Sequence, residues 1–276
     1  MPELPEVETV CRALSKVTTN FKVKKIEFFR KDLRWKVKDN LEMTLENNTF
    51  IKAYRRGKYI LISTNMDNIL LIHLGMSGQI RIKQKIDNIH KHDHMRMIVE
   101  NKNESFVIIY NDPRRFGYID LFHKTKLKEH FLIAKIGVEP MGKELSIEYL
   151  KNNFKKRSKN IKNALMDQKI IAGIGNIYAS EILFAAKIDP FRKVNSLNKN
   201  DLNKIIKFTK KILQKSINVG GTTIRDHIQP DGSLGYFKQN LQVYGKTNEN
   251  CNNCNYLITM KMISNRSTFF CKNCQI

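Results

Sequence analysis

The amino terminus places a secondary amine beside carboxylates. Methionine removal favours a small second residue, so loss of Met1 would leave Pro2 as the terminal residue. A terminal α-amine has a pKa of about 7.7–8.0 and is partly unprotonated near neutral pH, whereas a lysine amine has a pKa of about 10.4. Attack of such an amine on a sugar C1′ can form an iminium, with Glu3 and Glu6 as candidate acid and base. The alternative is a proline without a function, which is common in proteins that begin Met-Pro.

The cysteines are spaced for a metal. Cys251 and Cys254 form one CxxC pair, Cys271 and Cys274 form another, and 16 residues separate the pairs. This spacing predicts a tetrahedral four-thiolate zinc site on a β-hairpin, and a reducing cytosol disfavours the alternative of two disulfides. Four thiolates leave no open position for water, so the predicted site is structural. Cys11, the fifth cysteine, has apolar neighbours and is expected in the core.

Four further segments join basic side chains or glycines to turns. Glycines permit a tight helix–turn–helix whose backbone amides face a phosphate, and Arg with Phe on one turn suits insertion into DNA. Each segment could equally be a solvated turn or a plain connector. The segments are 55–59 (RRGKY), 73–78 (HLGMSG), 111–117 (NDPRRFG) and 162–180 (KNALMDQKIIAGIGNIYAS).

The run His92-Asp93-His94 raises the question of a second metal site. In a strand whose side chains alternate between faces, His92 and His94 would share one face without a third ligand. Contact with a phosphate, or plain exposure, is therefore favoured over a metal at this run.

Composition points to an anionic partner. The 276 residues include 49 Lys+Arg and 26 Asp+Glu, a net charge of +23, and 41% of the residues are hydrophobic, which excludes an extended disordered chain. Residues 151–276 hold 22 basic and 7 acidic side chains, against 27 and 19 in residues 1–150. Nucleic acid or an acidic membrane surface would suit this charge. The apolar runs are too short to span a membrane and the acidic start is unlike a signal peptide, so we expect a soluble intracellular protein.

The elements that must position these residues follow from periodicity. Apolar residues at three- and four-residue spacing predict a helix over 3–17, and amphipathic patterns predict helices around 178–186 and 205–217. Short alternating segments between turn residues predict a sandwich or barrel before residue 125. The predicted strands are Lys22–Phe29, Phe50–Tyr54, Tyr59–Ser63, Ile69–Leu74, Gln79–Lys83, Met95–Glu100, Ser105–Tyr110 and Tyr118–Phe122. We expect three domains: 1–130, 131–240 and 241–276.

The ordered set of motifs resembles the formamidopyrimidine-DNA glycosylase family, bacterial enzymes that excise 8-oxoguanine and ring-opened purines. The resemblance covers nearly the whole chain. It rests on PELPEVET at 2–9, RRGKY at 55–59, HLGMSG at 73–78, KHDH at 91–94, DPRRFG at 112–117, MDQ…AGIGNIYASE at 166–181, QVYG at 242–245 and the terminal cysteine pairs.

The resemblance implies an α+β fold: an N-terminal β-sandwich with an N-terminal helix, a helix–two-turn–helix domain and a C-terminal β-hairpin zinc finger. It implies a monomer in the bacterial cytosol or nucleoid that binds damaged double-stranded DNA, one structural zinc ion, and no redox or nucleotide cofactor. The implied roles are Schiff-base nucleophile for Pro2, acid/base for Glu3, β-elimination for Lys58, δ-elimination and phosphate binding for Arg266, DNA contact for His92, Arg114, Lys162 and Asn176, and filling of the gap left by a flipped base for Met76, Arg114 and Phe116.

Two alternatives remain open. Endonuclease VIII, which excises oxidised pyrimidines, typically begins PEGPE and lacks the Arg-x-Phe pair, whereas this chain has PELPE and Arg114-Arg115-Phe116. A DNA-binding protein without catalysis would fit the charge and the cysteines equally well. The coincidence of Pro2, Glu3 and Lys58 favours the enzyme, since a passive binder has no reason to combine them.

Overall fold

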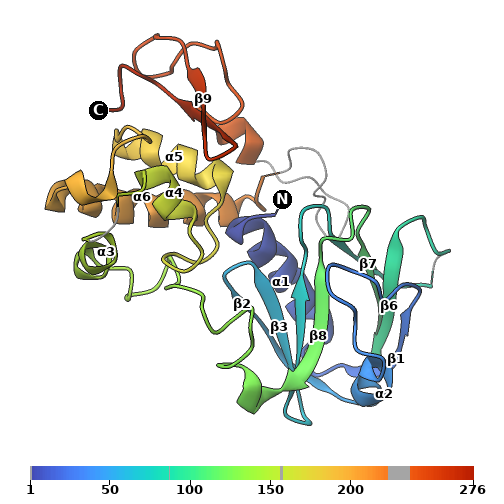
Figure 1. Ribbon diagram of the computed structural model, residues 1–276. Helices are drawn as coiled ribbons and strands as arrows, with labels where there is room; N and C mark the ends of the chain where they lie inside the picture. The colour runs from blue at the N-terminus through green and yellow to red at the C-terminus, as the bar shows by residue number, and fades with distance from the viewer. Residues whose placement is uncertain (1, 87, 156–157, 223–236) are drawn as a thin grey trace. The chain divides into compact units, whose positions relative to one another are not determined.

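The computed structural model describes residues 2–86, 88–155, 158–222 and 237–276 (Figure 1). The chain forms two compact units. The first unit comprises Met1–Ala134 with Val219–Tyr236, and the second comprises Lys135–Asn218 with Phe237–Ile276. The helices and the cysteine hairpin, which the sequence analysis treats as two domains, thus lie together in the second unit. No helix among the described residues is long and apolar enough to cross a bilayer.

The first unit is a sandwich of two antiparallel sheets with a helix at its start. One sheet has the strand order β1-β6-β7-β5 and the other has the order β2-β3-β4-β8. The elements are α1 (Leu4–Thr18), β1 (Lys22–Phe28), α2 (Leu41–Leu45), β2 (Phe50–Arg56), β3 (Tyr59–Thr64), β4 (Asn68–His73), β5 (Gln79–Lys83), β6 (Asp93–Glu100), β7 (Ser105–Asn111), β8 (Tyr118–His123) and a 3₁₀ turn at Lys124–Lys126. Every predicted strand is present, with ends within two residues of those predicted from sequence.

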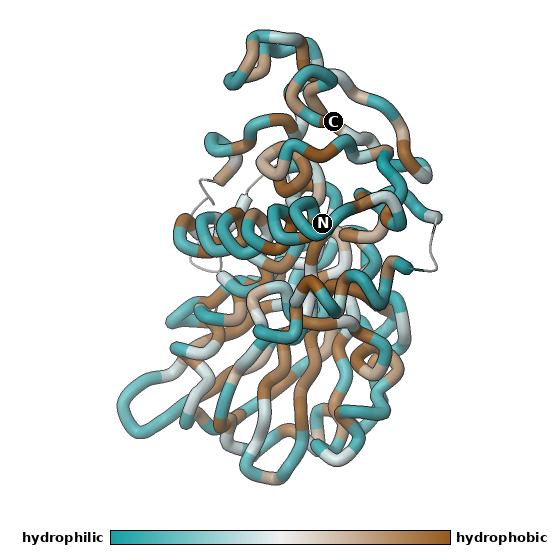
Figure 2. The backbone as a smooth tube through the Cα atoms, turned by 90° about the vertical axis from the view of Figure 1, so that its left-hand side faces the viewer, coloured by the Kyte–Doolittle hydropathy of each residue, from teal (hydrophilic) through white to brown (hydrophobic). Residues whose placement is uncertain are grey.

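One apolar core joins the two sheets and α1. Buried side chains from β1, β3, β4 and β6 pack with the apolar face of α1. Figure 2 shows the corresponding hydropathy, with hydrophobic stretches along the strands and hydrophilic ones at many of the connecting loops. Alternate residues of each strand face this core, and packing against it fixes the position of each strand. The start and end of every connecting loop are therefore fixed as well. The core therefore sets where the candidate site residues of this unit lie.

The described residues of the second unit form four α-helices and a hairpin. Its elements are α3 (Ile147–Phe154), α4 (Ile161–Met166), α5 (Asn176–Ala186), α6 (Lys199–Asn218), β9 (Thr259–Ile263), β10 (Arg266–Phe270) and 3₁₀ turns at Val194–Ser196 and Phe237–Asn240. The helix α5 is buried along almost its whole length, whereas α6 buries one face and exposes lysines on the other. Phe184 of α5 packs with Val243 and Ile258 against the buried cysteines, which explains why the helices and the hairpin share one unit.

Candidate active site and nucleic-acid interface

A buried carboxylate holds the amino terminus of α1. Glu6 accepts the backbone N–H of Glu3 at 2.8 Å and that of Thr222 at 2.7 Å. Glu3 and Glu6 are 3% and 2% exposed, and Pro2 is buried beside them. Gly221, with φ of +82°, approaches so closely that a Cβ there would lie 3.0 Å from Glu6 Oε1. The structure therefore encloses the predicted nucleophile and its neighbouring carboxylate, and Glu6 caps the helix.

Lys58 lies on the tight turn between β2 and β3. Gly57 takes the left-handed conformation that the turn requires, with φ of +57°, and Lys58 is 7% exposed. Arg55 Nε donates to Glu8 Oε2 at 2.8 Å and thereby ties the turn to α1. Burial raises the pKa of Glu8, but hydrogen bonds from Arg12 and Arg55 outweigh burial and hold that pKa below its ordinary value. An ionised Glu8 thus fixes β2, the strand that leads into the Lys58 turn, to α1, the helix that follows Pro2.

His73 is a neighbour of Lys58 that the sequence analysis did not assign. It pairs with Tyr59 across β3 and β4, and the two rings lie 4.8 Å apart. Burial, followed by the positive charges of Lys58 and Arg34, lowers the pKa of His73 to about 4. Gly75 N–H donates to His73 Nδ1 at 3.3 Å, so the ring proton is on Nε2. His73 is therefore a neutral donor at physiological pH, identifiable only once the strand register is known.

Met76, Arg114 and Phe116, called here the wedge residues, lie on two adjoining turns. Met76 is 37% exposed and Phe116 is 42% exposed, so both side chains reach solvent. Arg114 holds its guanidinium carbon 4.8 Å from the centre of the Phe116 ring. A Cβ on Gly75 would lie only 2.3 Å from the Phe116 carbonyl carbon. This close backbone approach brings the three predicted residues together at one edge of the sandwich.

His92 and His94 do not share one face of a regular strand, although their spacing predicted that they would. His92 precedes β6 with φ of +72° and is partly buried, whereas His94 is 2% exposed. The register of β6 against β7 also shifts between Asp93 and Met95. His94 Nε2 donates to the backbone carbonyl of Asp112 at 2.8 Å, which is a structural contact. The two histidines thus have different environments because a left-handed residue and a strand irregularity interrupt the period of two.

Lys162 and Asn176 converge on the hairpin. Lys162 Nζ donates to the Ser267 carbonyl at 2.8 Å and to Thr268 Oγ1 at 2.7 Å, and Asn176 Nδ2 donates to the same Ser267 carbonyl at 3.0 Å. Lys162 is fully buried, so its charge lies inside the unit. The resemblance implies a direct DNA contact from Lys162, but this burial instead favours positioning of Arg266, the residue before Ser267.

Arg266 is exposed just after a two-residue turn. Ser264 and Asn265 both have positive φ, of 47° and 59°, as a type I′ hairpin turn requires. Asn163 Nδ2 of α4 donates to Ser264 Oγ at 2.8 Å and holds the turn from the helical side. The hairpin thus presents Arg266 to solvent, while hydrogen bonds from the helices hold Ser264 before it and Ser267 after it.

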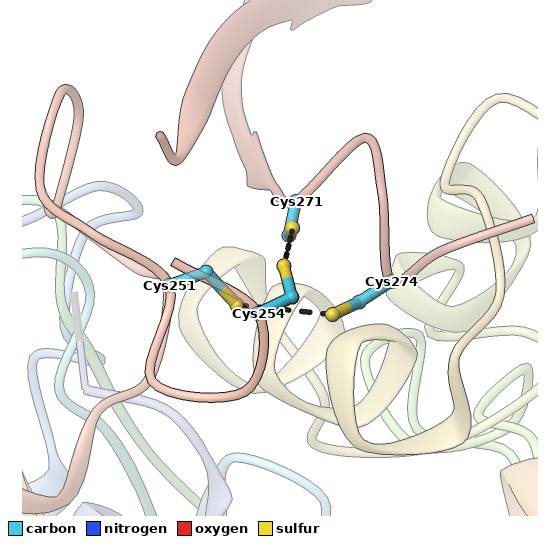
Figure 3. A group of neighbouring side chains, drawn as sticks. All are labelled: Cys251, Cys254, Cys271 and Cys274. Atoms are coloured by element: carbon cyan, nitrogen blue, oxygen red, sulfur yellow. Dashed lines mark hydrogen bonds between the residues drawn. The ribbon is translucent and has the colours of Figure 1, made fainter. Parts of the chain in front are cut away.

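The four paired cysteines form a cluster that suits a tetrahedral metal ion (Figure 3). Their sulfurs all lie within 4.8 Å of one another, with Cys251 and Cys274 at 3.8 Å and Cys254 and Cys271 at 3.4 Å. A four-thiolate zinc site with Zn–S bonds of about 2.3 Å would separate its sulfurs by about 3.8 Å. Hydrogen bonds from Asn273 and from a backbone amide lower the pKa of Cys254 to about 6. All four are free thiols, and no other metal-type cluster occurs in the part of the chain that the structure describes.

Cys11 is a core residue, as expected. It is 5% exposed within the apolar cluster beneath α1. Burial and the negative charge of Glu8 raise the pKa of Cys11 to about 12, so the thiol stays protonated and unreactive.

Comparison with known proteins decides the family. Residues 1–119 match the model of the formamidopyrimidine-DNA glycosylase N-terminal domain, and residues 136–228 match that of the H2TH domain of the same enzymes. A formamidopyrimidine-DNA glycosylase from Rickettsia bellii is 40% identical over 275 residues, covering 100% of this chain and 99% of the relative. One from Zymomonas mobilis is 42% identical and covers 100% of both chains. The chain belongs to the formamidopyrimidine-DNA glycosylase family.

Solved structures of that family have the same fold. A complex of Lactococcus lactis Fpg with N7-benzyl-Fapy-dG DNA superposes with a TM-score of 0.90 at 36% identity, covering 99% of each chain. A complex of the same glycosylase with abasic-site DNA gives 0.90 at 35% identity, again covering 99% of each chain. The α+β architecture expected from the resemblance is therefore confirmed, from the β-sandwich through the H2TH helices to the hairpin with its four cysteines.

Proposed function

We propose that this chain is a bifunctional DNA repair enzyme that excises oxidised purines, namely 8-oxoguanine and formamidopyrimidines, from duplex DNA and then cleaves the strand. The observation that carries the proposal is the placement of Pro2 and Glu3. They lie at the buried start of α1, in the unit that also carries Lys58 and the wedge residues. The solved Lactococcus lactis relatives are complexes with N7-benzyl-Fapy-dG DNA and with abasic-site DNA, which supports this proposal.

In the proposed reaction the Pro2 nitrogen attacks C1′ of the damaged nucleotide and the glycosidic bond breaks, so that the base leaves. Glu3 protonates the sugar ring oxygen as the ring opens, which yields an iminium between Pro2 and C1′. The iminium acidifies the C2′ proton, whose loss expels the 3′ phosphate in β-elimination. A second, δ-elimination expels the 5′ phosphate. Lys58 assists the first elimination and Arg266 the second.

The wedge residues provide access to the damaged base. The base must leave the stack before Pro2 can reach C1′, and unstacking costs a few kcal/mol, least for a poorly paired base. Met76, Arg114 and Phe116 would fill the vacated space, because they are exposed together on adjoining turns. Phe116→Ala should therefore slow excision opposite cytosine more than cleavage of a preformed abasic site, and equal losses would make Phe116 a packing residue.

The cysteine cluster would hold one structural zinc ion. Cys251, Cys254, Cys271 and Cys274 supply four thiolates at separations that suit zinc, and the ion would fix the hairpin with no open coordination position. Arg266 would then contact a phosphate, with Lys162 and Asn176 holding the hairpin strand behind it. His92 would contact the backbone from the first unit. Such contacts position the duplex rather than read its sequence.

We propose further that the enzyme acts as a monomer in the bacterial cytosol or nucleoid. Every residue of the proposed reaction is supplied by one chain, and the charge of +23 suits a duplex partner.

Borohydride trapping on an 8-oxoguanine duplex tests the mechanism. An iminium is reducible, so borohydride should join protein and DNA in one covalent adduct that peptide mapping places on residue 2. Pro2→Gly should retain some trapping because a primary α-amine remains, whereas a form that keeps Met1 should not trap. Lys58→Ala serves as the matched control and should lower elimination while sparing base release. An adduct on Lys58, or base release without any adduct, would refute Pro2 as nucleophile. A protein that binds the duplex but neither releases the base nor cleaves the strand would be a passive binder.

A further inference from the structure

Asp112 is a buried residue whose polar atoms all bind other parts of the first unit. Its side chain is 0% exposed. Oδ1 accepts the Ser77 hydroxyl at 2.6 Å, and Oδ2 accepts the Gly117 N–H at 2.8 Å and the Tyr110 hydroxyl at 3.1 Å. A buried carboxylate persists when its oxygens are satisfied in this way, and leaving one donor without its acceptor is unfavourable.

The backbone of Asp112 is held as fully as its side chain. Its N–H donates to the His92 carbonyl at 3.0 Å, and its carbonyl accepts His94 Nε2–H at 2.8 Å and the Arg115 N–H at 3.2 Å. His92 and Arg115 both have positive φ, of 72° and 56°, which is unfavourable for residues with a Cβ. Two strained residues thus bond directly to Asp112, and such strain gathers where geometry matters for function.

These bonds join the three loop segments that carry the candidate DNA contacts of this unit. Segment 73–78 carries Met76, segment 90–94 carries His92, and segment 112–117 carries Arg114 and Phe116. Ser77 Oγ, which donates to Asp112, also accepts the Arg114 N–H at 3.1 Å. One carboxylate therefore fixes Met76 relative to Arg114 and Phe116.

The packing around Asp112 leaves little freedom for another arrangement. A Cβ on Gly117 would lie 1.6 Å from the Tyr110 hydroxyl, and one on Gly78 would lie 2.9 Å from the same atom. The Tyr110 ring is fully buried, and burial together with Asp112 raises the pKa of Tyr110, so its hydroxyl remains a donor. The two turns that carry the wedge residues thus pack against a closely packed, hydrogen-bonded cluster around Asp112 and Tyr110.

We propose that Asp112 is a positioning residue for base extrusion: it holds the three segments in one arrangement before DNA binds, so that the wedge residues enter the stack together. This inference rests on the proposed glycosylase function. It locates the contribution of Asp112 in the insertion step rather than in the bond chemistry at Pro2. The competing explanation is that Asp112 only stabilises the fold.

The test compares Asp112→Asn with Asp120→Asn. Asp120 is another buried carboxylate of the same unit, 4% exposed, which binds Lys38 and His130 and none of the three segments. Each variant is measured in single turnover on an 8-oxoguanine·cytosine duplex and on a preformed abasic site. A 2-aminopurine base beside the lesion reports extrusion through its fluorescence. Trp35, the single tryptophan, packs on Tyr118 in this unit and reports its unfolding.

Disturbing one or two buried hydrogen bonds should lower excision by Asp112→Asn about 10- to 100-fold. Abasic-site cleavage should fall by no more than about threefold, since no base has to be extruded there. The 2-aminopurine signal should fall in parallel with excision, and a lesion opposite a poorly pairing base should restore part of the rate. Asp120→Asn should show no such selectivity, even where its loss of stability is as large.

A double-mutant cycle with Phe116→Ala completes the test. If Asp112 acts through the wedge residues, Asp112→Asn should have little further effect in the Phe116→Ala background. Equal losses on both substrates, or effects that multiply independently, would overturn the inference. Should Asp112→Asn not fold, Ser77→Ala removes the 2.6 Å hydrogen bond to Asp112 together with the acceptor of the Arg114 N–H, leaves the other bonds of Asp112 in place, and should show the same selectivity at smaller size. Trapping on residue 2 with a selective Phe116→Ala but an unselective Asp112→Asn would refute this inference alone, whereas failure of trapping would refute the glycosylase itself.

Discussion

The wedge turns of the first unit and the cysteine hairpin of the second both present exposed side chains on short turns, but they are stabilised differently. The wedge turns rest on an apolar core that spans two sheets and are held by hydrogen bonds to Asp112. The hairpin rests on a cluster of five buried residues, two of which are cysteines, and exposes Met260 and Met262. A large core allows polar contacts to set loop geometry, whereas a small one needs a metal to supply the missing stability.

The largest effect should follow loss of the metal site. Cys254→Ser removes one thiolate, and structural zinc supplies about 10–16 kcal/mol of apparent binding energy in isolated fingers. We expect residues 251–274 to unfold locally and duplex binding to be abolished, while the far-UV circular dichroism of the sandwich is kept. Cys11→Ala, which removes a buried thiol that is not a ligand, is the control and should still bind DNA. Unimpaired affinity in a zinc-free variant would contradict this account.

The variant Gly75→Ala should push apart the two turns that carry Met76 and Phe116. The added Cβ would lie 2.3 Å from the Phe116 carbonyl carbon, at a φ of +62°. Strain and overpacking together should lower the free energy of unfolding by about 2–4 kcal/mol. Excision of the damaged base should fall more than cleavage of a preformed abasic site. Gly245→Ala is the control, because Gly245 has φ of +78° and nothing within 4 Å of the added Cβ. Similar unfolding energies for the two variants would show that the close approach to Phe116 is unimportant.

Loss of the buried ammonium at Lys162 should weaken DNA binding through the hairpin. Lys162→Met removes the donors to Ser267 and Thr268 and should raise the Kd for duplex about tenfold, the effect of about 1.4 kcal/mol. If Lys162 acts by positioning Arg266, the variant Arg266→Ala should mask this loss, so that the double variant binds no worse than Arg266→Ala alone. Additive losses measured by fluorescence anisotropy would instead indicate that Lys162 contacts a phosphate itself.

The last prediction concerns pH, and its effect is close to zero at neutral pH. The pKa of His73 is about 4 in the folded protein, against about 6.5 for an exposed histidine. Between pH 6.5 and 4 the unfolded chain binds a proton that the folded His73 does not, so the first unit should lose stability as the pH falls through this window. His73→Gln should flatten the dependence of the free energy of unfolding on pH in this window. The measurement is urea unfolding at each pH, with Trp35 fluorescence as the signal. An unchanged slope would show that His73 titrates normally.

Patterns local in sequence predicted most of the fold. Alternating strands, the helix that begins at Leu4 and the CxxC spacing each depend on neighbouring residues, and all are present in the structure. The residues that sequence analysis missed depend on contacts between distant strands. His73 is identified by its pairing with Tyr59, and Asp112 by bonds that reach Ser77, 35 residues away.

Two expectations differ from the structure for stated physical reasons. The histidine run was expected to alternate, but His92 is left-handed and the β6 register shifts beside it. The resemblance implied a DNA contact from Lys162, yet two oxygens of β10 accept hydrogen bonds from its ammonium inside the unit. Neither a positive φ nor a buried partner is encoded in hydrophobic periodicity.

The hydrogen bond between Glu6 and Thr222 has a consequence for synthesis on the ribosome. The two residues are 216 positions apart, and the chain enters and leaves the second unit between them. A nascent chain that has emerged only as far as residue 134 contains the whole β-sandwich but not the Thr222 amide that Glu6 binds. Translation must therefore deliver helices α3 to α6 before the amino-terminal helix can acquire this partner. The sandwich can form early, but the contact that holds the start of α1 is completed late.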